Sequence, residues 1–147
     1  MKIIVRQVTD SEEKAEITKL ILGSLTEWFP SSADIETKAM MNMDYPFFAA
    51  FAEDEPVGFF SVKVHNEYTA DVFTAGVKKL YHRLGIGSTI LEACEEYCKG
   101  LGFSYIIAKT AEDAAQAFFN KNGYQPLRVF RDLRNEEDKK LFVAKCL

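Results

Sequence analysis

The spacing of apolar residues changes several times along the chain, which predicts an alternation of strands and helices. Short runs rich in β-branched and aromatic residues are typical of strands, whereas apolar residues three or four positions apart are typical of amphipathic helices. Runs of the first kind lie at Lys2–Val8, Phe47–Glu53, Val57–His65, Thr69–Val77, Phe103–Ala108, Gln125–Phe130 and Lys140–Leu147. Helical spacing begins at Asp10 and continues through Leu25, with Trp28 on the same face, until Phe29–Ser32 break it; it recurs at Ala33–Met43, about Ser88–Lys99 and Asp113–Asn122.

Local signals at the ends of these segments add detail. Asp10-x-x-Glu13 resembles a capping box, which begins a helix. The turn Glu53-Asp54-Glu55-Pro56 joins two strands into a predicted hairpin. Phe103–Ala108 is almost continuously apolar, which favours a strand buried on both faces, and the charged stretch Arg131–Lys139 is expected to separate the last two strands.

The chain contains no internal repeat, linker or break in composition. We therefore expect a single domain over residues 1–147. The alternation of elements predicts the α/β (α+β) class, with a central mixed, mostly antiparallel sheet flanked by helices.

Composition narrows the classes of function. Of the 147 residues, 48% are hydrophobic and 13% aromatic, which excludes a disordered chain. Eighteen basic and 22 acidic residues give a net charge of −4, and this argues against general nucleic-acid binding, in which phosphate neutralisation dominates. No run approaches the roughly 18 consecutive apolar residues of a membrane helix. We expect no nucleic-acid and no membrane partner.

Cysteine usage and the first residues bear on the compartment. The three cysteines are odd in number and are not clustered for a metal, which suits a reducing environment. Arg6 and Asp10 interrupt the N-terminus where a signal peptide would need its apolar core. A cytoplasmic protein is expected.

The segment that follows Val77 carries the most chemical information. Four potential cations lie within six residues there: Lys78, Lys79, His82 and Arg83. Gly85 and Gly87 then open a helix, whose unpaired N–H groups favour anions and whose missing side chains allow close approach. An alternative is that the glycines only form a turn and the lysines a solvated face. The known nucleotide loops do not fit, because Ile90 replaces the third glycine of a dinucleotide fingerprint and GxxxxGK[ST] is absent.

The stretch Ala70–Tyr124 resembles the core of the GNAT-type N-acetyltransferases. Their signature Q/R-x-x-G-x-G/A, at the start of the central helix, reads His82-Arg83-Leu84-Gly85-Ile86-Gly87 here. A second family feature, A-x-x-F/L-Y-x-K-x-G-F/Y, resembles Ala115–Tyr124. Two motifs in the right order are more specific than either alone. The predicted strand, two helices and hairpin before them also fit, so the resemblance covers essentially the whole chain.

The resemblance implies acetyl-CoA as co-substrate and direct attack of an amine on its thioester in a ternary complex; no metal is implied. The end of the strand, Ala75–Val77, would pair with the pantetheine amides, and an N–H near Val77 would polarise the thioester carbonyl. Backbone N–H groups of Leu84, Gly85, Gly87 and Ser88 would hold the pyrophosphate. The full set that the resemblance places at the cofactor is Ala75, Val77, His82, Arg83, Leu84, Gly85, Ile86, Gly87, Ser88 and Phe119. A homodimer is an expectation at the level of the family only.

Three positions depart from the family pattern. His82 stands where Gln or Arg is usual, and Glu112 stands where Asn commonly opens the second motif. Phe119 replaces the Tyr that usually acts as general acid. Tyr124, Tyr105 or water would protonate the leaving thiolate instead, and the sequence does not choose among them; Tyr124 is taken as the catalytic candidate.

The acceptor amine needs a base, since an alkylammonium has a pKa of about 10.4 and attacks only after losing a proton. Asp71 is the first candidate because, with simple alternation, it shares a sheet face with Val77; Glu67 is the reserve. A β-bulge in this strand would upset that alternation. In the alternative reading, Asp71 is an ordinary solvated strand residue.

The acceptor itself is open. Met40, Met41 and Met43 lie where the family lines its acceptor site with variable helices, so a partly apolar pocket is expected there. A small amine, an amino acid, a peptide N-terminus and a protein lysine all fit. Two other functions are also open: Phe119 and Glu112 favour a non-catalytic acyl-CoA-binding module, and a purely structural Gly-Ile-Gly turn would favour an interaction domain.

Overall fold

The computed structural model describes residues 2–110, 113–132 and 135–147. Its strands are β1 (Ile3–Val8), β2 (Phe47–Ala52), β3 (Glu55–Asn66), β4 (Thr69–Val77), β5 (Tyr105–Thr110), β6 (Gln125–Asp132) and β7 (Asn135–Cys146). Its helices are α1 (Ser11–Gly23), α2 (Ser32–Asn42), the 3-10 helix η1 (Lys79–Tyr81), α3 (Ile86–Gly100) and α4 (Asp113–Lys121). Glu112, one of the departures from the family pattern, lies outside the described residues.

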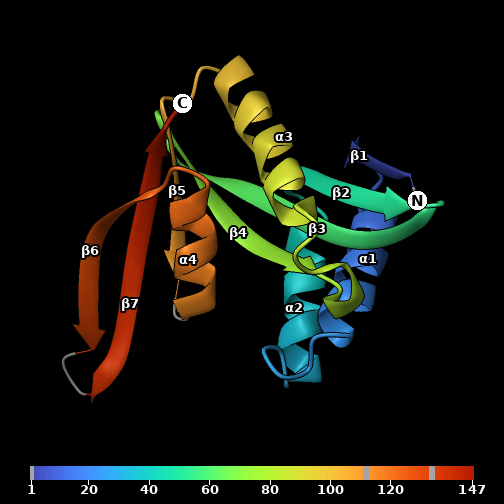
Figure 1. Cartoon of the computed structure of the whole chain (residues 1–147), viewed down its shortest axis with the longest axis horizontal. Helices are drawn as coiled ribbons and strands as arrows, with labels where there is room; N and C mark the ends of the chain where they lie inside the picture. The colour runs from blue at the N-terminus through green and yellow to red at the C-terminus, as the bar shows by residue number, and fades with distance from the viewer. Residues whose placement is uncertain (1, 111–112, 133–134) are drawn as a thin grey trace. The chain divides into compact units, whose positions relative to one another are not determined.

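The described strands form one sheet in the order β1-β2-β3-β4-β5-β7-β6. β4 runs parallel to β5, whereas β2 is antiparallel to β1 and β3, and β7 is antiparallel to β5 and β6. This arrangement confirms the predicted α/β class with a mixed, mostly antiparallel sheet and flanking helices. Figure 1 shows the path of the chain through these elements.

The chain divides into two compact units. The first consists of Met1–Lys63 and Phe73–Tyr97, and the second consists of Val64–Val72 and Cys98–Leu147. β4 therefore contributes its first residues to the second unit and Phe73–Val77 to the first. A single domain over residues 1–147 stays a prediction.

In the first unit, α1 and α2 pack against each other (Figure 1, blue and cyan). Both helices begin where the sequence offers a cap: Asp10 Oδ2 accepts from the Glu13 N–H at 2.9 Å, and Ser31 Oγ accepts from the Asp34 N–H at 3.1 Å. The apolar core of this unit comprises Val8, Ile17, Ile21, Leu22, Leu25, Ile35, Phe47, Ala49, Phe51 and Phe59. Each large side chain buried in this way contributes about 1.5–3 kcal/mol.

The β2–β3 hairpin of the first unit is tighter than expected. Its turn consists of Glu53 and Asp54, with φ values of 49° and 72°, and Ala52 pairs with Glu55. Two successive positive φ values match the twist of the flanking strands, so a two-residue turn suffices. The predicted four-residue turn is therefore too long.

In the second unit, β5 lies between β4 and β7. Thr69–Val72 of β4 pair in parallel with Tyr105–Ala108, and β7 pairs with β5 on its other edge. The helix α4 contacts β5 and β7. β6 and β7 form a long hairpin (Figure 1, orange and red).

Three expectations about the elements are wrong. β5 is not buried on both faces: its side chains alternate, with Tyr105 46% exposed and Ile106 fully buried, because only one face of this strand is covered. The charged stretch Arg131–Lys139 does not separate the last strands: Arg131 pairs with Lys139, because the ladder is built from backbone N–H and C=O groups. The first helix ends at Gly23, before the expected Leu25 and Trp28, because the Ser24 hydroxyl and N–H both donate back to the Ile21 carbonyl. No helix in the described parts of the chain is long and apolar enough to cross a membrane.

Candidate functional site

The last residues of β4 offer backbone donors along one edge of the strand. The Lys78 N–H donates to Val57 O of β3 at 2.8 Å, and the Thr74 N–H donates to the Ser61 hydroxyl of β3 at 3.2 Å. Successive residues of a strand direct their N–H groups to opposite edges. The N–H groups of Ala75 and Val77 therefore point away from β3.

The loop after β4 has an unusual backbone. After η1, Arg83 has a φ of 66° and Gly85 has a φ of 76°. Left-handed residues alternating with right-handed or extended ones turn successive N–H groups toward the same side, which forms an anion-binding concavity. Arg83, Leu84 and Gly85 are exposed, so this concavity is open to a ligand. A methyl group on Gly85 would meet nothing within 4 Å.

The start of α3 adds to this concavity. The Gly85 carbonyl accepts from the Thr89 N–H at 3.1 Å and from the Thr89 hydroxyl at 3.0 Å, so Gly85 occupies the N-cap position. Glycine has no side chain with which to cap the first-turn N–H groups of Gly87 and Ser88. The buried side of the helix is anchored by Ile86 and Ile90. A helix N-terminus of this kind carries about half a positive charge toward the loop.

His82 contacts the end of β4. Its Nε2 atom lies 2.6 Å from the Val77 carbonyl oxygen, and its ring centroid lies 6.3 Å from that of Trp28, which follows α1. The sequence offered no signal for this bond. His82, which was expected to contact the phosphate, therefore already uses its Nε2 atom for a hydrogen bond to the Val77 carbonyl.

Lys79 is also engaged within the first unit. Its ammonium forms an ion pair with Glu27 and lies 5.4 Å from the centroid of the Trp28 ring. Both side chains of the ion pair are about half exposed. A carboxylate combined with an aromatic face is a typical receptor for an alkylammonium.

The catalytic candidates belong to the second unit. Asp71 is half-buried and pairs with Ile107 in the sheet, whereas Glu67 is exposed. Tyr124 is only 1% exposed, its ring contacts the Phe119 ring edge-on at 5.1 Å, and Lys145 Nζ lies 5.7 Å from its centroid. Asp71 and Tyr124 therefore belong to a different compact unit from the loop residues Arg83 and Gly85.

The methionines expected at the acceptor site lie at the C-terminal end of α2 and just after it. Met40 is 69% exposed, Met41 is 37% exposed and Met43 is partly buried. Between them lies Asn42, whose side chain is fully buried. Within the described residues, no group of three or more His, Cys, Asp or Glu side chains could hold a metal ion.

A buried polar cluster near this helix end was missed by the sequence analysis. Its members lie on α1, α2, β3 and β4 of the first unit, and they are Lys14, Thr18, Asn42, Ser61 and Thr74. The Lys14 ammonium donates to the carbonyl oxygens of Tyr45 at 2.8 Å and Met43 at 3.4 Å. Burial lowers the pKa of Lys14 below its ordinary value of 10.5, and the Asp44 carboxylate partly opposes that shift.

The model of the acetyltransferase (GNAT) family matches residues 14–124. No curated protein matches the sequence. Three similar solved structures cover nearly the whole chain. A candidate acetyltransferase of the GNAT family from Desulfovibrio desulfuricans has a TM-score of 0.85 at 16% identity, covering 99% of each chain.

The other two come from different organisms. The ribosomal-protein-S18-alanine N-acetyltransferase from Escherichia coli has a TM-score of 0.75 at 18% identity, covering 99% of this chain and 94% of that one. The PaiA N-acetyltransferase from Thermoplasma acidophilum, in complex with coenzyme A, has a TM-score of 0.73 at 20% identity, covering 100% of both chains. At these identities the likeness shows the fold.

Proposed function

The chain belongs to the acetyltransferase (GNAT) family, and from this premise we propose that it transfers the acetyl group of acetyl-CoA to the amine of a small-molecule or peptide acceptor. The observation that carries the proposal is the loop between β4 and α3. Its left-handed residues Arg83 and Gly85 and the glycine-capped helix start form a concavity suited to a pyrophosphate. Coenzyme A bound to the Thermoplasma relative supports the same co-substrate.

The donor would lie along the free edge of β4. Pantetheine amides would pair with Ala75–Val77, whose alternate N–H groups point away from β3. The N–H of Val77 would donate to the thioester carbonyl and stabilise the negative charge that develops on its oxygen. This interaction strengthens as the carbonyl becomes tetrahedral, so it lowers the barrier rather than only binding the donor.

Transfer would follow in one ternary complex. The neutral amine attacks the thioester carbonyl carbon, a C–N bond forms, and the C–S bond breaks to release the CoA thiolate. The proton lost by the amine goes to Asp71, directly or through water, and the thiolate receives a proton from Tyr124 or water. The partial burial of Asp71 and the near-complete burial of Tyr124 agree with positions protected from bulk solvent.

The acceptor is proposed to be cationic in its resting form. The net charge of −4 favours a positively charged substrate. Beside the loop, Glu27 and Trp28 already hold one alkylammonium, that of Lys79. We assign no more specific acceptor than an amine, and no nucleic-acid or membrane partner.

Binding is tested by titrating the protein calorimetrically with acetyl-CoA at two ionic strengths. We expect micromolar affinity that weakens with salt, and loss of binding in Gly85→Glu, whose side chain would place a carboxylate at the phosphates. Gly100→Glu, at the far end of α3, is the matched control. Absence of binding by the unmodified protein would contradict the proposal.

Turnover is tested by incubating the protein with acetyl-CoA and a series of amines and measuring the release of the CoA thiol. Asp71→Asn should lower kcat by about 10²-fold or more, as expected for loss of a general base, whereas Glu67→Gln should leave it within about threefold. If the two variants are equally active, Asp71 is not the base.

A second function is favoured by one observation. Phe119, at the position usual for the Tyr general acid, packs its apolar ring against Tyr124. A non-catalytic acyl-CoA-binding module would keep the loop and lose turnover. Acetyl-CoA binding without acetylation of any amine in the screen would support that function.

A further inference from the structure

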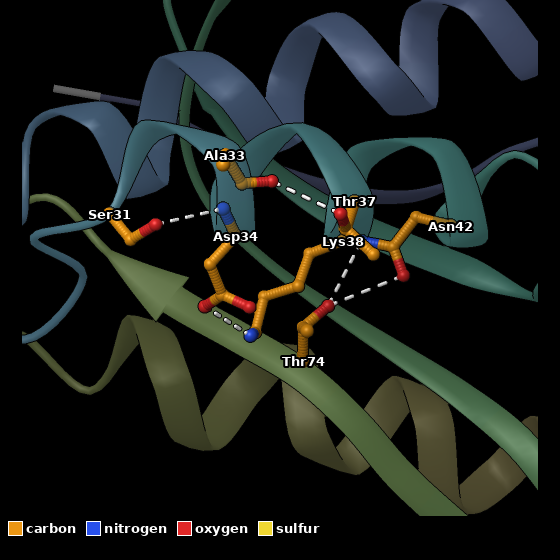
Figure 2. Close-up of polar contacts among 7 residues, drawn as sticks. All are labelled: Ser31, Ala33, Asp34, Thr37, Lys38, Asn42 and Thr74. Carbon is orange, nitrogen blue, oxygen red and sulfur yellow. Dashed lines mark hydrogen bonds and ion pairs between the residues drawn. The ribbon is translucent and has the colours of Figure 1, made fainter.

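Asn42 joins the end of α2 to β4 inside the first unit. Its Nδ2 atom donates to Thr74 Oγ1 at 2.9 Å and to Thr18 Oγ1 at 3.0 Å, and its Oδ1 atom accepts from Thr74 Oγ1 at 3.3 Å. Figure 2 shows the two contacts between Asn42 and Thr74. Thr74 Oγ1 also lies 2.8 Å from Ser61 Oγ.

These four side chains occupy positions that an apolar core would normally fill. Asn42, Thr18 and Ser61 are fully buried, and Thr74 is 5% exposed. Asn42 continues the buried stripe of α2, seven residues after Ile35 and three after Ala39. Burying a polar group costs free energy unless it is hydrogen-bonded, and replacing both partners of a buried bond by apolar groups of the same shape can be neutral or even stabilising. No buried side-chain polar atom in the described residues lacks a partner. A satisfied network of this kind fixes one geometry, since hydrogen bonds are directional where apolar contacts allow sliding.

The network fixes the residues that immediately precede the proposed thioester site. Two residues after Thr74, Gly76 packs so closely against α1 and the residues after it that an added Cβ would lie 3.1 Å from side-chain carbons of Ile21 and Leu25. Val77 is held through its carbonyl by His82. The segment Thr74–Val77 is therefore anchored by a side-chain network at one end, by helix packing in the middle and by a histidine at the other end.

The backbone of Thr74 is also bonded to this network. The Thr74 N–H donates to the Ser61 hydroxyl of β3 at 3.2 Å. The Ser61 hydroxyl thus contacts both the backbone and the side chain of Thr74, and together these contacts restrict the position of β4 at this residue. Loss of the Thr74 hydroxyl would remove its contacts with Asn42 and with the Ser61 hydroxyl at once.

We propose that Asn42 and Thr74 are positioning residues for acetyl transfer. They hold the Ala75–Val77 edge of β4 in the position from which the Val77 N–H can polarise the thioester carbonyl. The proposal rests on the proposed function. The same pair connects this edge to α2, the helix that carries Met40 and Met41. The donor edge and this helix are thereby held in one geometry.

The first test compares three substitutions by steady-state kinetics with acetyl-CoA and an amine found in the screen. Thr74→Val has nearly the same shape and lacks the hydroxyl; we expect a roughly tenfold lower kcat, because a displacement of a fraction of an ångström at the reacting group has effects of this order. The KM for acetyl-CoA should stay within about twofold, since the pyrophosphate loop is unchanged. Thr74→Ser restores the hydroxyl and should restore kcat.

The matched control is Thr37→Val on α2, the helix that carries Asn42. Its hydroxyl donates only locally, to Ala33 O at 3.1 Å, and faces away from Thr74 (Figure 2). This variant should keep kcat unchanged. Equal kcat values in Thr74→Val and Thr37→Val would overturn the proposal, as would failure of Thr74→Ser to recover. Should Thr74→Val not fold, Thr18→Val removes the other hydroxyl partner of Asn42 Nδ2 and carries the same expectation.

The second test does not depend on turnover. Amide hydrogen exchange of a peptide covering residues 73–78 should accelerate in Thr74→Val and not in Thr37→Val or Thr74→Ser. Unchanged exchange in Thr74→Val would overturn the positioning role. If the unmodified protein acetylates no amine but shows the exchange pattern, the proposed function fails while the anchoring of β4 stands.

Discussion

His82 and Val77 are joined by a hydrogen bond of 2.6 Å between the imidazole Nε2 atom and the Val77 carbonyl oxygen. Because a carbonyl oxygen only accepts, Nε2 carries the proton. In the neutral ring Nδ1 is then an acceptor, so His82 offers a donor to an anion only as an imidazolium. His82 can thus bond to the Val77 carbonyl both as the neutral imidazole and as the imidazolium. It can donate a second hydrogen bond to a phosphate only as the imidazolium.

This bond predicts that His82 matters more for turnover than for cofactor affinity. His82→Ala should lower kcat roughly tenfold through displacement of Val77, while acetyl-CoA affinity changes by about threefold or less because the backbone donors of the loop remain. His82→Gln, whose amide can reach a carbonyl, should recover part of the loss. Kinetics combined with calorimetric titration separates the two effects. An equal fall in affinity and kcat in His82→Ala would instead identify the phosphate as the principal partner.

Replacing Arg83 should change the free energy of unfolding and the affinity for acetyl-CoA in opposite directions. A side chain at a φ of 66° costs about 1 kcal/mol, so Arg83→Gly should relieve strain and raise the free energy of unfolding by up to about 1 kcal/mol, less the added entropy of the unfolded chain. The same variant loses a cation, so acetyl-CoA binding should weaken and depend less on salt.

Arg83→Asn is the control for this trade. Asparagine tolerates the left-handed region and also lacks the charge, so its binding loss should equal that of Arg83→Gly with a smaller gain in stability. Urea unfolding and titration at two ionic strengths measure both quantities. Destabilisation by Arg83→Gly would contradict backbone strain at this residue. Unchanged acetyl-CoA affinity in both variants would contradict a contribution of the Arg83 charge to binding.

The parts of the fold that sequence could predict are those that depend on near neighbours. The bounds of β4 match the prediction residue for residue, and Asp10 caps α1 as the local pattern indicates. The glycine-led start of α3 was also visible, because a helix end and its cap lie within one turn of chain. The family motif added the order of these elements.

The features that were missed depend on residues distant in sequence. Asn42 lies 32 residues from Thr74 and 24 from Thr18, and its neighbours Met41 and Met43 suggest only a helix end. The positive φ of Arg83 had no signal, since arginine is not a residue that marks such a turn. An asparagine on the apolar stripe of a helix is the one hint that would have justified a search for a polar partner.

Gly58 predicts a further connection between packing and the donor edge. An added Cβ there would lie 3.0 Å from Val77 Cγ2, 3.2 Å from Ile90 Cδ1 and 3.3 Å from the Gly76 carbonyl oxygen. Gly58→Ala should therefore destabilise the fold by about 1–3 kcal/mol. Gly23→Ala, where an added Cβ meets nothing within 4 Å, is the control and should be neutral or slightly stabilising. Equal urea midpoints for the two variants would contradict the close packing.

Lys14 predicts a rise of stability with pH. Its pKa is lowered in the folded protein because burial disfavours the ammonium, and the Asp44 carboxylate offsets part of that shift. The cost of the buried charge is present below the folded-state pKa and is relieved as pH rises from there toward 10.5, where the unfolded chain also loses the proton. In that window the unfolded state binds more protons than the folded state, so the free energy of unfolding increases with pH.

A difference measurement isolates this contribution. Lys14→Met cannot titrate, and the other ionisable groups are common to both proteins, so the free energy of unfolding of the unmodified protein minus that of Lys14→Met should rise between neutral pH and about 10.5. Asp44→Asn removes the charge that favours the ammonium, so in that background the rise should begin at lower pH. A difference that is flat or falls with pH would mean that the Lys14 ammonium is better stabilised in the fold than in water. The hydrogen bonds to Met43 and Tyr45 would then outweigh its burial.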